Sequence, residues 1–159
     1  MNKLDDNYFM NLALKEAEKA LNCDEVPVGA VIVNAAGEVI SSGFNSVENA
    51  VSCIMHAEII AIKAAQKKLN NWRLDKCSLY VTLEPCIMCC GAILLSRISR
   101  VVYGASDPKG GVSNSILGAK IELIGNVMEN NSSILLKSFF KSKRQNIRYD
   151  KSANTGSCK

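Results

Sequence analysis

The sequence predicts an α/β protein with a mixed five-stranded sheet that carries helices on both faces. The first observation is a short apolar run at residues 28–33 and a second strand at 39–44, joined by a turn with Gly37, which predicts a β-hairpin. The second is the alternation of helical and strand-like segments from residue 56 onward. The third is that the later strand-like segments are joined by short βαβ steps, which require parallel pairing. An antiparallel hairpin combined with parallel units gives a mixed sheet.

The spacing of apolar residues assigns the individual elements. Residues 5–22 place Phe9, Ala13 and Ala17 at helical spacing, and Pro27 blocks any continuation of that helix. The run at 28–33 contains several β-branched residues, as buried strands do. Further along, the pattern predicts a helix at 56–68, a strand at 78–83, a buried helix at 86–96, a strand at 100–104, a strand at 120–124 and a last helix that starts near Asn126.

Length and composition favour one domain, which we expect to span residues 1–151 of the 159. The remaining residues, 152–159, offer no apolar stretch to bury and are expected to form a disordered tail. The start lacks the pattern of a signal peptide, and no stretch approaches the roughly 20 apolar residues that span a membrane. Seven unevenly spaced cysteines are typical of reduced thiols, some of them binding metal, so we expect the cytoplasm.

The positive charge is concentrated at the C-terminal end. The whole chain carries +4, whereas residues 137–159 hold seven basic residues against Asp150 alone, which makes this segment +6 and the rest −2. Such a segment suits a phosphate backbone. Charge alone leaves a second interpretation equally open, a solvated helix face followed by a soluble tail.

Two motifs carry the chemistry. Cys86 and Cys89 stand in a C-x-x-C spacing directly after the expected strand at 78–83. Alone, this spacing fits zinc, dithiol redox chemistry or two thiols of the core. His56 is the only histidine, and both it and Cys86 begin expected helices. Sites in such sheets form at the carboxyl ends of strands and the adjoining helix starts, so we expect the three side chains to meet.

One histidine and two thiolates leave tetrahedral zinc with an open fourth position, which is typical of catalytic rather than structural zinc. A water molecule at that position loses its proton near neutral pH. Glu58, two residues after His56, can reach into the same pocket and carry the proton. His56 alone could be an ordinary core or surface histidine, and it is the combination of H-A-E with P-C-x-x-C that favours a metal site.

H-x-E followed by P-C-x-x-C is the signature of zinc-dependent nucleobase deaminases. Over most of its length the chain resembles the bacterial tRNA-specific adenosine deaminases, which have the cytidine deaminase-like three-layer fold. The blocks that carry this resemblance are E-V-P-V-G-A at 25–30, Asn45, H-A-E at 56–58, W-R-L at 72–74, L-Y-V-T-L-E-P-C-I-M-C at 79–89, S-R-I at 96–98, R-V-V-Y-G-A at 100–105, D-P-K-G-G at 107–111 and F-F-K-S-K-R at 139–144.

The resemblance implies hydrolysis of adenosine to inosine at the wobble position of a tRNA anticodon, typically of an arginine tRNA. It implies one zinc ion per subunit, a homodimer and a tRNA anticodon loop as partner. The residues that it implicates are His56, Cys86 and Cys89 as zinc ligands, Glu58 as proton shuttle, Asn45 and the backbone of Ala57 at the base, Asp107 and Lys109 near the splayed nucleotides, and Arg144 and Arg148 at phosphates.

The chain departs from the family pattern at three places. Cys53 precedes H-A-E where the family has a proline-containing segment, and a fourth zinc ligand there would close the catalytic position. Cys90 replaces a small residue, although the C-x-x-C spacing favours Cys89 as the ligand. The connection at 115–118 is shorter than the segment that the family usually has before its last strand.

Three other functions fit part of the sequence. A zinc deaminase of a free base or nucleoside, such as guanine or cytosine, would keep the same zinc residues but has no need of the basic C-terminal segment. A non-catalytic zinc RNA-binding module would have no use for Glu58. A Cys–His thiol hydrolase would leave Glu58 and the second cysteine unexplained.

Overall fold

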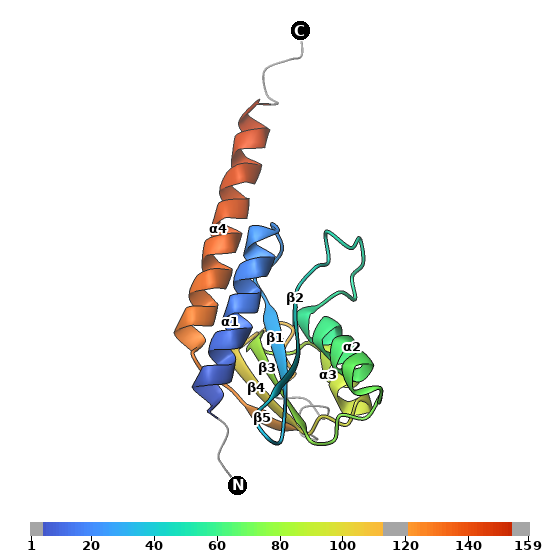
Figure 1. Ribbon diagram of the computed structural model, residues 1–159. Coiled ribbons are helices and arrows are strands. Elements are labelled where there is room, and N and C mark those ends of the chain that lie inside the picture. The colour runs from blue at the N-terminus through green and yellow to red at the C-terminus, as the bar shows by residue number, and fades with distance from the viewer. Residues whose placement is uncertain (1–4, 113–120, 154–159) are drawn as a thin grey trace.

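The computed structural model describes residues 5–112 and 121–153. In chain order its elements are α1 (Asp6–Asn22), β1 (Gly29–Asn34), β2 (Val39–Phe44), α2 (Ala57–Leu69), β3 (Cys77–Leu83), α3 (Ile87–Leu95), β4 (Arg100–Ala105), β5 (Glu122–Ile124) and α4 (Glu129–Ala153) (Figure 1). The first helix begins after Asp5, whose carboxylate accepts the N–H of Tyr8 at 3.1 Å and so caps the helix start.

The five strands form one mixed sheet in the order β2-β1-β3-β4-β5. The strand β1 pairs antiparallel with both β2 and β3, whereas β3, β4 and β5 pair in parallel. This arrangement confirms the predicted hairpin and the predicted parallel βαβ units. The parallel strands β3 and β4 end beside each other, and β3 leads directly into the start of α3.

Helices cover both faces of the sheet, as predicted. The helices α1 and α4 lie side by side on one face, and α2 and α3 lie together on the other (Figure 1). Successive residues of β1 alternate between the two cores: Ala30 and Ile32 pack on the side of α2 and α3, and Val31 packs on the side of α1. Because both faces are buried, β1 carries no polar side chain from Gly29 to Val33.

Two glycines let the helices approach the sheet closely. A Cβ atom at Gly29 of β1 would overlap the backbone of α1, and a Cβ atom at Gly43 of β2 would come within 2.8 Å of the Ala57 carbonyl oxygen in α2. A side chain at either position would push a helix away from the sheet. Gly43 therefore sets the depth at which the first turn of α2 sits, and this turn carries His56 and Glu58.

The structure differs from the sequence predictions mainly at element ends. The last helix begins at Glu129 rather than near Asn126, because Asn126 and Met128 adopt left-handed backbone conformations with φ of 66° and 56°. It runs through Ala153, so two residues assigned to the tail are helical, and residues 154–159 lie outside the described part of the chain. Of the expected strand at 120–124, Glu122–Ile124 form β5, Ile121 is not part of the strand, and residue 120 lies outside the described part of the chain. Within the described residues no helix is both long and apolar enough to cross a membrane.

Candidate metal centre and active-site pocket

Two helix starts bring the side chains of the three predicted metal ligands together. His56 is the N-cap of α2 and Cys86 is the N-cap of α3, and neither side chain caps its own helix. Their side chains are therefore available for other contacts, and Cys89 lies on the first turn of α3. The Nδ1 atom of His56 is 3.7 Å from the Cys86 sulfur and 3.5 Å from the Cys89 sulfur. The predicted meeting of the three residues is thus observed.

These separations fit a tetrahedral zinc ion. With Zn–S bonds of about 2.3 Å and Zn–N bonds of about 2.0–2.1 Å, tetrahedral geometry places neighbouring ligand atoms roughly 3.5–3.8 Å apart. The three ligand atoms in the protein all lie within 4.8 Å of one another. No fourth ligand from the described residues joins this cluster, and a site with three protein ligands keeps a position for water or substrate.

The two additional cysteines near the motifs do not join the cluster. Cys90 is fully buried in the core between α2, α3 and the sheet, and Cys53 is exposed on the loop before α2. Among residues 5–112 and 121–153, the only group of three or more such ligands close enough to hold a metal is His56, Cys86 and Cys89. The structure therefore agrees with the C-x-x-C spacing in placing Cys89, and not Cys90, in the cluster.

The protein groups of the cluster already polarise one another. A hydrogen bond from the Cys89 thiol, together with His56, lowers the pKa of Cys86 to about 3. The same bond to Cys86, with burial, raises the pKa of Cys89. The bond with Cys86 also raises the pKa of His56. The cluster thus favours the thiolate form of Cys86, and binding of a metal would displace the proton of Cys89, because the metal ligand is the thiolate.

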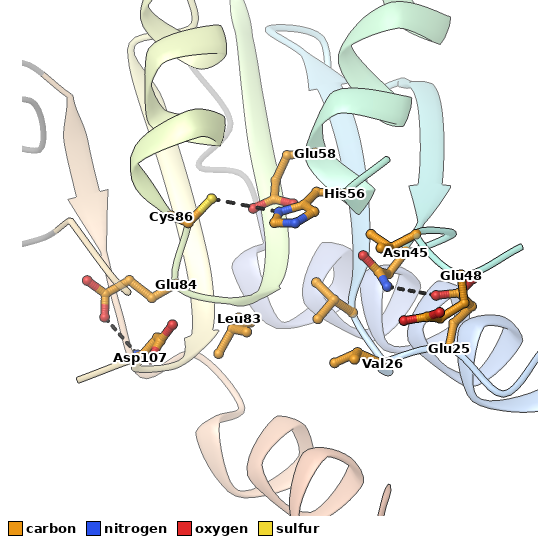
Figure 2. A pocket seen from close by; sticks show the side chains of 12 residues that line it. Glu25, Val26, Asn45, Glu48, His56, Glu58, Leu83, Glu84, Cys86 and Asp107 are labelled. Carbon is orange, nitrogen blue, oxygen red and sulfur yellow. Dashed lines mark hydrogen bonds between the residues drawn. The ribbon is translucent and has the colours of Figure 1, made fainter. Parts of the chain in front are cut away.

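Glu58 adds a buried carboxyl group beside this cluster. It lies on the first turn of α2, is only 4 % exposed, and points into the same region as the His56 ring (Figure 2). Burial raises the pKa of Glu58, and the charge on His56 opposes that rise. A carboxyl group with a raised pKa next to a metal position can take up a proton and release it, which is the requirement for a general acid and base.

The cluster opens into a cavity of about 300 Å³, a size within the range of small-molecule sites. The two sides of the cavity come from distant parts of the sequence (Figure 2). Its lining consists of Glu25, Val26, Val28, Asn45, Val47, Glu48, His56, Glu58, Leu83, Glu84, Cys86 and Asp107. Several of the polar groups are buried, so a ligand in the cavity would meet fixed hydrogen-bonding partners with little water around them.

Comparison with known proteins gives the family. The family model of the cytidine and deoxycytidylate deaminase zinc-binding region matches residues 3–105. The chain is 43 % identical over 148 residues to the tRNA-specific adenosine deaminase of Bacillus subtilis (strain 168), covering 88 % of this chain and 91 % of that protein. It is 46 % identical over 148 residues to the enzyme of the same name from Aquifex aeolicus (strain VF5), covering 88 % and 97 %. The chain belongs to the tRNA-specific adenosine deaminases.

Solved structures agree with this assignment. A structure from a study of A-to-I editing by tRNA:A34 deaminases at the wobble position is 41 % identical, with a TM-score of 0.76 over 81 % of this chain and 99 % of that one. A guanine deaminase from Bacillus subtilis is also similar, with 38 % identity and a TM-score of 0.61 over 65 % and 66 % of the two chains. These matches confirm the cytidine deaminase-like fold that the sequence predicts for this protein. The family model and the His-Cys-Cys cluster together support zinc as the metal.

The structure places the other predicted site residues at different distances from this centre. Asn45 and Asp107 line the cavity, and Ala57 is fully buried at the start of α2. Lys109 is exposed on the loop after Asp107 and is not part of the cavity lining. The two arginines lie on α4: Arg144 is exposed, and the side chain of Arg148 is outside the described part of the structure.

Two buried carboxylates of the cavity were not predicted as site residues. Glu25 is 1 % exposed and Glu84 is 5 % exposed. The Glu84 carboxylate accepts the backbone N–H of Asp107 at 2.9 Å, while the Glu84 N–H donates to Ala105, so the turn before Cys86 is fastened to the loop at 107–111. The sequence feature that could have identified them is their position inside the family blocks at 25–30 and 79–89.

Proposed function

We propose that this protein converts adenosine to inosine at the wobble position of a tRNA anticodon, with an arginine tRNA as its substrate. The observation that carries the proposal is the buried Glu58 carboxyl group beside the cluster of His56, Cys86 and Cys89, in the lining of a cavity of about 300 Å³. The similarity to proteins named tRNA-specific adenosine deaminase supports both the base and the RNA.

In this proposal His56, Cys86 and Cys89 hold one zinc ion per subunit. When bound, the metal supplies a water molecule that is acidic near neutral pH. Glu58 would take up a proton from the water that attacks C6 of adenine and would return a proton to the departing amine. Adenosine and water thereby give inosine and ammonia. Asn45 and the backbone of Ala57 hold the base so that C6 faces the metal centre.

RNA is the preferred substrate because the chain carries a basic C-terminal segment. The helix α4 extends past the end of the sheet (Figure 1), and Lys137, Lys141 and Arg144 are exposed along it. We assign phosphate contacts to Arg144 and Arg148, and contacts with the nucleotides that flank the target to Asp107 and Lys109. An anticodon loop suits this arrangement because its bases are already unstacked, so the target base can enter the cavity at little cost.

We also propose that the protein forms a homodimer and that it acts in the cytoplasm. The outer side of α3 supports a dimer: Ile87 is 68 % exposed, Leu95 is 76 % exposed, and a Cβ atom at Gly91 between them would meet open space. Apolar residues flanking a glycine allow another helix to pack closely against this surface. Sedimentation of the wild type and of Leu95→Glu measures the assembly, and a monomeric wild type contradicts it.

The activity test uses the full-length protein and a synthetic anticodon stem-loop of an arginine tRNA with adenosine at the wobble position. Inosine is measured by mass spectrometry of the digested RNA, with and without a zinc chelator. Free adenosine, cytidine and guanine are assayed in parallel, because the similarity to a guanine deaminase makes a free base the strongest rival substrate. Chelator-sensitive inosine in the RNA is expected. Turnover of a free base without turnover of the RNA contradicts the proposal.

A further inference from the structure

Glu25 is a buried carboxylate that the proposed reaction does not use. It lies in the connection between α1 and β1, lines the cavity and is 1 % exposed. Within residues 5–112 and 121–153 no basic side chain forms an ion pair with it. A carboxylate without a cation is costly to bury unless hydrogen bonds compensate for the lost water. The hydrogen-bond donors that surround the Glu25 carboxylate therefore indicate its role in the cavity.

All of these donors come from the segment that follows β2. The Oε2 atom of Glu25 accepts from the Asn45 side-chain amide, Nδ2, at 3.1 Å. The Oε1 atom accepts from the backbone N–H of Asn49 at 2.7 Å and from its Nδ2 at 3.0 Å. One oxygen thus holds the side chain that faces the substrate, and the other holds the loop that carries it.

This pairing fixes which end of the Asn45 carboxamide faces the cavity. A carboxylate only accepts hydrogen bonds, so the Nδ2 end of Asn45 has to point to Glu25 and the Oδ1 end has to point elsewhere. Figure 2 shows the oxygen of Asn45 turned away from Glu25. The backbone of Asn45 is fixed as well, because its N–H donates to Val28 at 2.9 Å. Within the part of the chain that the structure describes, no donor bonds to Oδ1, which leaves this oxygen for a ligand.

The geometry points to Glu25 as the positioning residue that sets the hydrogen-bonding polarity of the substrate cavity. By binding Nδ2 of Asn45 it presents Oδ1 as an acceptor for a donor group of the nucleoside. The inference rests on the proposed function for the identity of that nucleoside, but the orientation of the carboxamide can be tested without turnover. Glu25 acts on the substrate through Asn45.

Replacing Glu25 with Gln separates the polarity of this residue from its size. The single oxygen of a glutamine is needed by the two donors of Asn49, so its NH₂ group faces Asn45. Asn45 then has to turn its carboxamide over, which places Oδ1 on residue 25 and an N–H in the cavity. We expect kcat/KM on the anticodon stem-loop to fall about ten- to a hundredfold, as for the loss of a hydrogen bond to a charged group. Zinc content should stay at the wild-type level.

A second substitution restores the original polarity. In Glu25→Gln combined with Asn45→Asp, the aspartate accepts from the glutamine NH₂ and still offers an oxygen to the cavity. We expect this double variant to recover about tenfold over Glu25→Gln. Asn45→Asp alone sets two carboxylates against each other and should be the least active of the set. Glu18→Gln, which removes an exposed carboxylate from α1, is the matched control and should behave as the wild type.

The orientation itself is measured by exchange of the Asn45 side-chain amide protons with water in ¹⁵N-labelled protein. Slow exchange in the wild type and faster exchange in Glu25→Gln is expected, because the amide then faces the open cavity. Wild-type kcat/KM in Glu25→Gln, or a double variant no better than Glu25→Gln, overturns the inference. If the wild type makes no inosine in RNA, the proposed function fails instead, and unchanged exchange in Glu25→Gln is then the result that overturns this inference.

Discussion

The cavity around His56 and the exposed side of α4 meet the proposed RNA substrate in different ways. In the cavity, polar groups such as Glu25, Glu58 and Glu84 are 1–5 % exposed, and the chain supplies their hydrogen-bond partners. On α4, the charges of Lys141 and Arg144 stand in solvent. Chemistry on a base needs groups that are already oriented, whereas attraction of a phosphate backbone needs mainly charge. Single substitutions should therefore have large effects in the cavity and small, graded effects on α4.

The largest effect is expected from Cys89→Ser, with Cys90→Ser as the matched control. Both cysteines are fully buried and adjacent, but only Cys89 belongs to the metal cluster. Serine is a poor zinc ligand, so Cys89→Ser should lose zinc and all deamination. Cys90→Ser should keep zinc and lose about 1–2 kcal/mol of stability, because a hydroxyl enters an apolar core. Elemental analysis and thermal unfolding measure both. Zinc loss in Cys90→Ser alone contradicts the assignment of the ligands.

Glu58→Gln should come next in size. The amide keeps the shape of the side chain but cannot carry a proton, so inosine formation should fall at least about a hundredfold. Zinc content and the affinity for the anticodon stem-loop should change little, because Glu58 lies outside the ligand cluster. Single-turnover assays at saturating RNA measure the chemical step, with Glu18→Gln as the control. Near-normal deamination in Glu58→Gln contradicts the role of Glu58 as proton shuttle.

The same contrast explains how much of the site could be predicted from the sequence. His56, Cys86 and Cys89 fall at helix starts, and the short βαβ units bring helix starts to one edge of the sheet, so local patterns were enough. Glu25 gave no such signal. Its partners Asn45 and Asn49 are 20 and 24 residues away, and a glutamate before Val26-Pro27 has the appearance of a solvated loop residue. Burial of a polar residue is decided by distant donors, which local patterns do not reveal.

The ends of the last helix were missed for a related reason. The expected tail began at residue 152 because the sequence there offers no apolar stretch, yet α4 continues through Ala153. A helix end without an apolar stripe is held by its own backbone hydrogen bonds, and hydrophobic patterning does not report on those. At the other end, the left-handed conformations of Asn126 and Met128 delay the start of α4, and methionine gives no warning of such a conformation.

A smaller effect inside the cavity is expected from Gly111→Ala. A Cβ atom at Gly111 would overlap the carboxylate of Glu84, which is buried and holds the N–H of Asp107. The added methyl group should displace this carboxylate and loosen the loop that borders the cavity. We expect kcat/KM to fall about tenfold with zinc retained, comparable to the loss of one buried hydrogen bond to a charged group. Pro108→Ala changes an exposed residue of the same loop and serves as the control. Equal activity of both variants contradicts a role for the Glu84–Asp107 contact.

The smallest effect, and the sharpest test of the contrast, is expected from Arg144→Ala. Arg144 is exposed on α4, so its loss should weaken binding of the anticodon stem-loop only a few-fold at moderate salt. The slope of log affinity against log salt concentration should decrease in magnitude by about 0.7, the value for one phosphate contact with a single strand. The rate at saturating RNA should stay at the wild-type level, because none of the α4 side chains that the structure describes lines the cavity. Lys63→Ala, which removes an exposed charge from α2, should leave the salt slope unchanged. A lower rate at saturating RNA in Arg144→Ala contradicts the proposal that α4 acts only in RNA binding. It would show that α4 also influences the oriented groups of the cavity.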